Sequence, residues 1–168
     1  MTVEVRAAGP ADSAAIRHVH CAAFPTPAEA DLVDALARDG DQMLSLVAVE
    51  DGTIVGHILF SRMEVRADDG TLAGLGLAPV AVTPDRQGEG IGSALIEAGL
   101  QAAGSIGTEI VFVLGEPAYY GRFGFDARTA KPFASPYAGP YFQARMLGTV
   151  KTPTSGRADY APAFAGLS

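Results

Sequence analysis

The sequence predicts an α/β protein whose mixed central sheet is flanked by helices. Three segments between residues 43 and 83 are separated by short acidic–glycine turns, which is typical of antiparallel strands. A glycine-rich segment, Gln87–Ser93, then separates an apolar stretch from a segment whose apolar residues recur at helical spacing. A continuous apolar run, Ile110–Leu114, follows and fits a strand buried on both faces. An antiparallel N-terminal part is therefore expected to lead into a pair of parallel strands.

The first forty residues are expected to form one strand and two helices. Residues 2–8 alternate between apolar and polar side chains, as a half-buried strand does. A turn at 9–12 leads into a helix, which the prolines of 24–27 break. Thr26 is placed to cap a second helix, with Glu29 at the capping-box position, and a glycine at position 40 ends it.

A three-stranded antiparallel meander follows. Its strands are expected at 43–50, 53–66 and about 72–83, joined by turns at Asp51-Gly52 and at 68–70. Pro79 lies within the third strand and has no N–H to donate, so that strand should be bulged or splayed there.

The second half of the chain begins with a helix at 90–103 and a strand at 108–114, which complete a parallel unit with the third strand of the meander. Ligands of such units bind at the carboxyl ends of the strands, where the glycine segment stands. A short helix from Pro117, a short strand at Phe125, a loop over 131–140 and a last strand over 141–150 follow.

Residues 1–150 are expected to be one domain, and 151–168 a tail of the same domain that lies along its surface, held by Tyr160 and Phe164.

Composition narrows the class of function. The chain has 168 residues, 48% of them hydrophobic and 18% charged, with a net charge of −7. This acidic balance argues against nucleic acid and anionic membranes as partners. A single cysteine, Cys21, allows no internal disulfide, and no apolar run reaches membrane-spanning length. With no signal peptide evident, the expected location is cytoplasmic.

The glycine segment carries the clearest chemical signal. A helix that begins at glycines exposes backbone N–H groups and the positive end of its dipole, which suits a phosphate. The Gly-Lys-Ser/Thr of a Walker A loop is absent, and the dinucleotide pattern fails because Ser93 or Leu95 stands where its last glycine or alanine should be. The pattern Gln-x-x-Gly-x-Gly fits Gln87, Gly90 and Gly92. A turn without a ligand stays open as the alternative.

That pattern resembles the pyrophosphate loop of the GNAT superfamily of N-acetyltransferases. The segment Pro117–Phe125, with its Tyr-Gly-Arg-Phe-Gly-Phe ending, resembles the second motif of that family, one strand later. The stretches Gly74–Val82 and Val55–Ser61 are similar to a subgroup of predicted acetyltransferases without an assigned substrate. The resemblance implies a GNAT-like sheet whose parallel pair is splayed at the acetyl-CoA site. It also implies transfer of an acetyl group to a primary amine of a small molecule or peptide by direct attack.

The resemblance also assigns residues to the acetyl-CoA site. Backbone groups of the strand would meet the pantetheine arm, and those of the loop would meet the pyrophosphate. These residues are Val80, Ala81, Val82, Gln87, Gly88, Glu89, Gly90, Ile91, Gly92 and Ser93. Glu89 departs from the family, where many members have a basic residue. Tyr120 aligns with the tyrosine that acts as general acid on the departing thiolate.

The general base and the acceptor pocket stay undecided. Relatives often place a glutamate on the strand before the loop, but residues 71–83 contain no Asp, Glu or His. His57 and Glu116 are candidates for the base, against structural roles as a core histidine and a helix cap. Glu29 and Asp31 of the second predicted helix are further candidates, against roles in a capping box and on a solvated face. Phe24 and Glu29 are candidates for the acceptor pocket. No metal is expected. A CoA-binding sensor without turnover is the alternative function, and a homodimer stays open.

Overall fold

A computed structural model describes residues 2–166 of the chain. Its centre is an eight-stranded sheet in which six strands follow the order β1-β2-β3-β4-β5-β7, while β8 pairs with β3 and β6. The β4–β5 and β6–β8 pairs are parallel, and the other pairs are antiparallel. The strands are β1 Val3–Ala7, β2 Gln42–Glu50, β3 Thr53–Ala67, β4 Gly70–Val82, β5 Ile110–Leu114, β6 Phe133–Ala134, β7 Phe142–Met146 and β8 Gly156–Tyr160.

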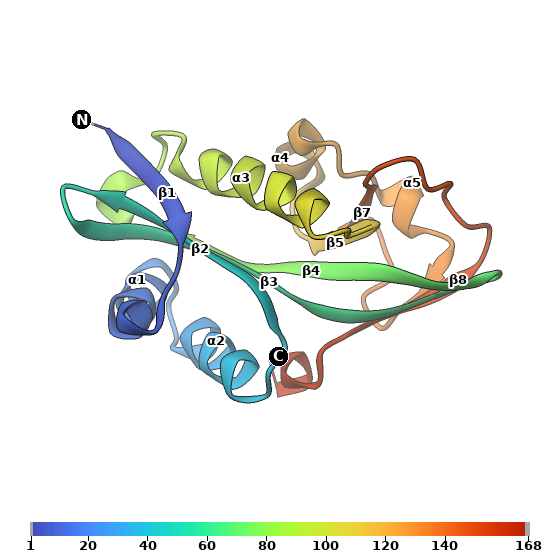
Figure 1. Ribbon diagram of the computed structural model, residues 1–168, viewed down its shortest axis with the longest axis horizontal. Coiled ribbons are helices and arrows are strands. Elements are labelled where there is room, and N and C mark those ends of the chain that lie inside the picture. The colour runs from blue at the N-terminus through green and yellow to red at the C-terminus, as the bar shows by residue number, and fades with distance from the viewer. Residues whose placement is uncertain (1, 167–168) are drawn as a thin grey trace.

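Helices cover both faces of the sheet (Figure 1). Helix α3 lies on one face with α4 near its start, and α1 and α2 lie on the other face. The α-helices are α1 Ser13–Ala23, α2 Ala28–Arg38, α3 Ile91–Ser105, α4 Pro117–Tyr120 and α5 Ala127–Ala130. The 3₁₀ helices are η1 Pro10–Asp12, η2 Pro84–Arg86, η3 Gly121–Phe123 and η4 Pro162–Gly166. The expected α/β architecture is confirmed.

Burial of apolar side chains explains this layering. Ile58 and Phe60 of β3 face α3 and pack with Leu95 and Leu100 of that helix. Leu59, between them in sequence, points to the opposite face and packs with α1 and α2. The alternation of the strand therefore supplies two separate cores from one element.

Strand β4 is bulged at Pro79, as its missing N–H predicts. Leu77 pairs with Phe60 and Val80 pairs with Ile58, so two residues of β4 stand opposite one residue of β3. The β4–β5 pairing is short, running only from Gly74↔Ile110 to Gly76↔Phe112. Beyond Gly76 the two strands diverge, and this splay opens the sheet beside the start of α3.

The C-terminal third differs from expectation. Phe125 does not begin a strand: a single bridge joins Asp126 to Ala144, and α5 follows at once. The segment 151–168 was expected to lie along the surface, but residues 156–160 form β8, pair with β3, and bury Ala158 completely. Tyr160 and Phe164 hold this segment to the core as expected, through contacts with each other and with the cluster beside α2. Residues 167–168 lie outside the described part.

Candidate functional site

The glycine segment forms an open turn at the start of α3. Gly88 and Gly90 have φ angles of 80° and 86°, which only glycine adopts at little cost. Gly90 is the residue before the helix and has no side chain to cap it, while Ile91 is buried and anchors the first turn. The first N–H groups of α3 therefore have no capping side chain and are free to bind an anion.

A pocket of about 410 Å³ lies between this turn, the end of β4 and α4. Its lining consists of Val80, Ala81, Val82, Arg86, Gln87, Gly88, Gly90, Ile91, Gly92, Ser93, Tyr119 and Arg122. Nine of the ten predicted cofactor residues are in this lining. The exception is Glu89, which is exposed and lies outside it.

The three β4 residues do not offer the same backbone groups. The Thr83 N–H donates to the Val55 carbonyl at 2.9 Å, so by alternation Ala81 turns its own N–H and carbonyl toward β3. Val80 and Val82 turn theirs toward the splayed side. The Val82 carbonyl accepts a hydrogen bond from Gln87 Nε2 at 2.9 Å. The Gln87 side chain therefore ties the loop to the strand, and the Val80 N–H, Val80 carbonyl and Val82 N–H remain for a ligand.

Sequence reasoning missed three side chains of the pocket: Arg86, Tyr119 and Arg122. Arg122 donates to Ser93 Oγ at 2.9 Å and lies 5.1 Å from the centre of the Tyr119 ring. No ion pair of Arg122 is found among residues 2–166. Arg86 donates to the Glu50 carboxylate at 2.7 Å. Arg86 stands next to Gln87 and Arg122 lies within the second motif, but only the fold turns both toward one pocket.

Tyr120 lies beside the pocket, behind Tyr119. A Cβ built on Gly115 would lie 2.4 Å from the Tyr120 ring. The ring therefore packs directly on the backbone of Gly115, just after β5, and a larger residue there would displace it. The ring meets Tyr119 edge-on, with centroids 5.0 Å apart. Burial, followed by the neighbouring Tyr119, raises the pKa of Tyr120 to about 12. Tyr120 is therefore protonated throughout the neutral range, as a proton donor must be.

The candidates for the base and for the acceptor pocket are dispersed. Glu116 is exposed and caps α4, accepting from the Ala118 N–H at 3.4 Å. Glu29 lies in the first turn of α2, where the Ala28 N–H contacts Thr26 Oγ1 at 3.4 Å; its Oε1 is buried without a partner among residues 2–166. Phe24 follows the last residue of α1 and is half-buried. Its ring is stacked on that of His20, with the ring centroids 6.1 Å apart.

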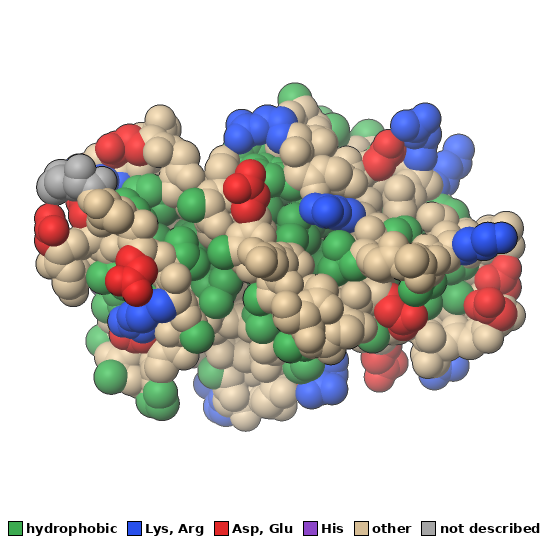
Figure 2. Space-filling view, turned by 45° about the horizontal axis from the view of Figure 1, so that its top comes forward, with side chains coloured by type: hydrophobic (Ala, Val, Ile, Leu, Met, Phe, Trp, Pro, Cys, Tyr) green, Lys and Arg blue, Asp and Glu red, His purple; other side chains and the backbone are tan. Residues whose placement is uncertain are grey.

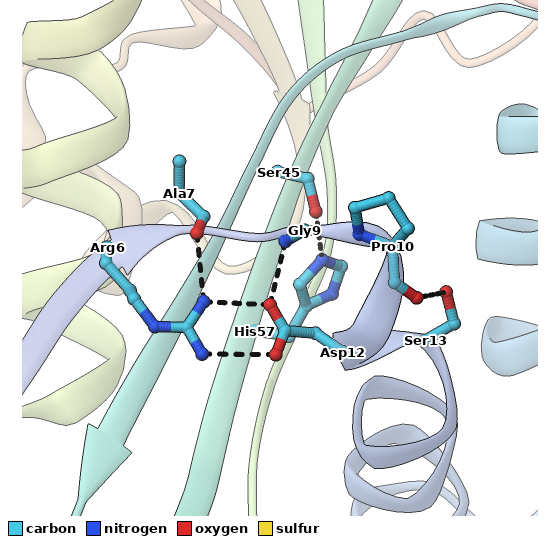
Figure 3. Close-up of polar contacts among 8 residues, drawn as sticks. All are labelled: Arg6, Ala7, Gly9, Pro10, Asp12, Ser13, Ser45 and His57. Atoms are coloured by element: carbon cyan, nitrogen blue, oxygen red, sulfur yellow. Dashed lines mark hydrogen bonds and ion pairs between the residues drawn. The ribbon is translucent and has the colours of Figure 1, made fainter. Parts of the chain in front are cut away.

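His57 belongs to a buried chain of polar groups. Its Nε2 lies 2.8 Å from Ser45 Oγ and its Nδ1 lies 2.8 Å from His20 Nε2. Figure 3 shows the Ser45 contact beside the turn that the Arg6–Asp12 ion pair holds. Both histidines are fully buried, and burial lowers the pKa of His57 to about 3 and that of His20 to about 4. The charge of His20 further lowers the pKa of His57. The charge of Asp34 partly offsets the effect of burial on His20 by raising its pKa.

The histidine pair should make the fold sensitive to acid. In the unfolded chain both groups take up a proton near pH 6.5, whereas the folded chain keeps them neutral down to about pH 4. Their contribution is therefore present above pH 6.5 and is lost as the pH falls below it. We expect the free energy of unfolding to fall by about 2 kcal/mol per histidine between pH 7 and pH 5, measured by urea denaturation.

His18 offers the matched control, because it is the third histidine of the sequence and is exposed on α1, the helix that carries His20. His57→Gln should flatten the dependence of stability on pH between 7 and 5, even though it also lowers stability at pH 7. His18→Gln should leave the dependence unchanged. An equal slope in wild type and His57→Gln would show that the pair does not titrate as described.

The structure carries no sign of a metal centre or a membrane span within residues 2–166. No group of three or more His, Cys, Asp or Glu side chains there could hold a metal ion. No helix in that range is long and apolar enough to cross a membrane. On the face drawn in Figure 2, the described basic and acidic side chains are interspersed and form no continuous basic patch.

The sheet opens after Gly76, next to a glycine turn that begins a helix. Comparison with known families shows which class of protein has this arrangement. The chain belongs to the GNAT acetyltransferase family, because its residues 4–128 match the family model described as an acetyltransferase (GNAT) domain.

Two Escherichia coli (strain K12) proteins are similar to this chain in sequence. "Uncharacterized N-acetyltransferase YjhQ" is 41% identical over 133 residues, which cover 77% of this chain and 73% of that protein. "Uncharacterized N-acetyltransferase YhbS" is 37% identical over 123 residues, which cover 73% and 72%.

Two solved structures show the same fold, one with CoA bound and one with acetyl-CoA bound. The crystal structure of Escherichia coli YhbS in complex with CoA has a TM-score of 0.88 and 30% identity, covering 99% of this chain and 93% of that one. The structure of a GNAT acetyltransferase from Brucella melitensis in complex with acetyl-CoA has a TM-score of 0.79 and 37% identity, covering 97% and 98%.

Proposed function

We propose that this protein transfers an acetyl group from acetyl-CoA to a primary amine of a small molecule or peptide by direct attack. The observation that carries the proposal is the 410 Å³ pocket, which joins the glycine turn, the free backbone edge of β4 and Tyr119 of α4, with Tyr120 packed against Tyr119. Similar proteins with the same fold bind CoA and acetyl-CoA.

The pocket residues fit acetyl-CoA in charge and shape. The N–H groups at the start of α3 would hold the pyrophosphate, and Arg122, which forms no ion pair among residues 2–166, would add positive charge. The free groups of Val80 and Val82 would pair with the amides of the pantetheine arm, and one of these N–H groups would hold the oxyanion. Tyr120, protonated because its pKa is raised, would give its proton to the departing thiolate.

We propose that no single general base is indispensable for this reaction. His57 is buried, Glu116 caps a helix, and β4 bears no carboxylate before the loop. The acceptor amine would then arrive neutral or lose its proton through water. The value of kcat/KM should rise with pH up to the pKa of the acceptor, with no fall from Tyr120 below about pH 12.

Single substitutions test this directly. His57→Ala, Glu116→Ala, Glu29→Ala and Asp31→Ala should each lower kcat/KM by about ten-fold at most, which is ~1.4 kcal/mol of barrier. One folded, CoA-binding variant that loses nearly all activity together with the acidic limb of the pH profile would identify a base and contradict the proposal.

The alternative is a CoA-binding sensor that keeps the fold and lacks turnover. Calorimetry with CoA followed by a screen of amine pools for CoA release separates the two functions. Binding with release supports the transferase, and binding without release for any amine supports the sensor. A wild-type protein that binds no CoA at millimolar concentration would contradict both.

A further inference from the structure

A tyrosine of the C-terminal strand covers the point where the sheet opens. Gly76 is the last residue of β4 that pairs with β5, and a Cβ built on it would lie 2.6 and 2.9 Å from two ring atoms of Tyr160. The Tyr160 ring therefore lies directly on the backbone of Gly76, and only glycine admits it. Met63, which is the β3 partner of Tyr160, places its Sδ in the same gap.

The ring is held by uncharged neighbours. The Tyr137 ring meets the Tyr160 ring edge-on, with centroids 5.4 Å apart, and the centroid of the Phe164 ring lies 4.9 Å from that of Tyr160. The ring is thus fixed on one side of the splay by aromatic and thioether groups, and no charged side chain takes part in these contacts.

Two hydroxyl groups on this face have no hydrogen-bond partner among residues 2–166. The Tyr160 hydroxyl, on a residue that is partly exposed, takes part in none of the hydrogen bonds found there. Ser61 stands opposite Gly76 on the same face, and its Oγ is fully buried without a hydrogen bond in that range. Polar groups in such positions usually bind water or a ligand, because an unmade hydrogen bond is costly.

Tyr120 packs beside β5, the other strand of the diverging pair. Its ring lies on Gly115, just after β5, in the same way as the Tyr160 ring lies on Gly76 of β4. Burial raises the pKa of Tyr160 above its usual value, and Tyr137 and then Tyr120 add to this rise. One ring is thus packed on the last residue of β4 that pairs with β5, and the other on the residue that follows β5.

We propose that the Tyr160 hydroxyl binds the acceptor amine at this opening, and that the acceptor carries its amine on an apolar or aromatic body. This inference rests on the proposed function. The phenol oxygen accepts a hydrogen bond from an N–H of the neutral amine, which leaves the nitrogen lone pair free to attack. The aromatic rings of Tyr137 and Phe164 around Tyr160 favour an acceptor whose remaining part is apolar. A polyamine would instead require carboxylates there.

The position of Tyr160 in the chain fits a role in choosing the acceptor. The family model ends at residue 128, so β8 lies outside the part of the chain that defines the family. A residue there is suited to what differs between members, the acceptor, and not to the donor site that they share.

Tyr160→Phe tests the inference, because it removes the hydroxyl and keeps the ring that packs on Gly76. At saturating acetyl-CoA, phenethylamine and spermidine serve as probes of an aromatic and a polycationic amine. We expect wild type to favour phenethylamine, and Tyr160→Phe to raise its KM about ten-fold with the KM for acetyl-CoA unchanged, as one lost hydrogen bond predicts. Tyr141→Phe, which removes the hydroxyl of an exposed tyrosine, should behave as wild type.

Calorimetric titration of phenethylamine into the CoA complex gives a readout that needs no turnover. Weaker binding by Tyr160→Phe, with an unchanged melting temperature, supports the inference. An unchanged KM and Kd for phenethylamine, or a preference for spermidine, overturns it and leaves Tyr160 as a packing residue. Failure of the proposed function appears differently, as absent CoA binding or as amine binding without acetyl transfer in the wild type.

Discussion

Tyr120→Phe should lower kcat by about 10²–10⁴-fold while leaving the affinity for acetyl-CoA nearly unchanged. The substitution removes the hydroxyl that we propose as proton donor to the departing thiolate, and it keeps the ring that packs against Gly115, Tyr119 and Phe125. Because the pKa of Tyr120 is about 12, the wild-type hydroxyl is protonated throughout any practical assay, so the loss should be the same from pH 6 to pH 9. Steady-state kinetics with calorimetric CoA binding measure both quantities.

Tyr119 is the matched control for this experiment. It is the adjacent tyrosine, and its hydroxyl lies on the wall of the pocket, 3.2 Å from where a Cβ of Gly92 would be. Tyr119→Phe should therefore alter the KM for acetyl-CoA slightly and kcat less than Tyr120→Phe does. Equal and small losses in both variants would mean that the tyrosine pair only packs.

Gly92→Val should weaken CoA binding by about 10–100-fold, measured by calorimetry. A Cβ at this position points into the pocket toward Tyr119, and the branched side chain would cover the N–H groups at the start of α3. The loss corresponds to one or two charge-assisted hydrogen bonds at roughly 1.5–3 kcal/mol in total. The fold should survive, since valine is no worse than glycine in a helix.

Gly104→Val separates this effect from any change in the helix itself. Gly104 lies in α3 as well, and nothing stands within 4 Å of a Cβ built there. The variant makes the same chemical change far from the pocket, so its CoA affinity should equal that of wild type. Equal binding by Gly92→Val and wild type would remove the glycine turn from the donor site.

Local signals were sufficient for the elements and for the glycine turn. The Asp51-Gly52 turn, with φ angles of 49° and 78°, joins β2 and β3 as the dipeptide predicts, and Pro79 marks the bulge of β4. The glycines at 88, 90 and 92 line one pocket because their conformations and spacing are fixed within a few residues. Such features depend on backbone freedom and on periodicity, which a single sequence displays directly.

Long-range pairing was not predictable in the same way. Nothing in the sequence indicated that residues 156–160 would join β3 as β8, because a five-residue strand carries little periodic signal and its partner lies about ninety residues earlier in the chain. The same limit applies to the buried His20–His57 contact, which joins α1 to β3. These contacts form because the sheet and helices bring distant side chains together, and burial then decides their protonation.

The sequence by itself therefore determined the α/β class, the order of the main elements and the glycine turn, since each rests on neighbouring residues. Only the tertiary structure decided which groups face the pocket. It turned the backbone of Ala81 toward β3 and left that of Val80 and Val82 for a ligand, and it placed Arg122 beside Ser93 and Tyr160 on Gly76. The physical reason is that strand alternation, the divergence of β4 and β5 and side-chain packing are properties of the assembled sheet.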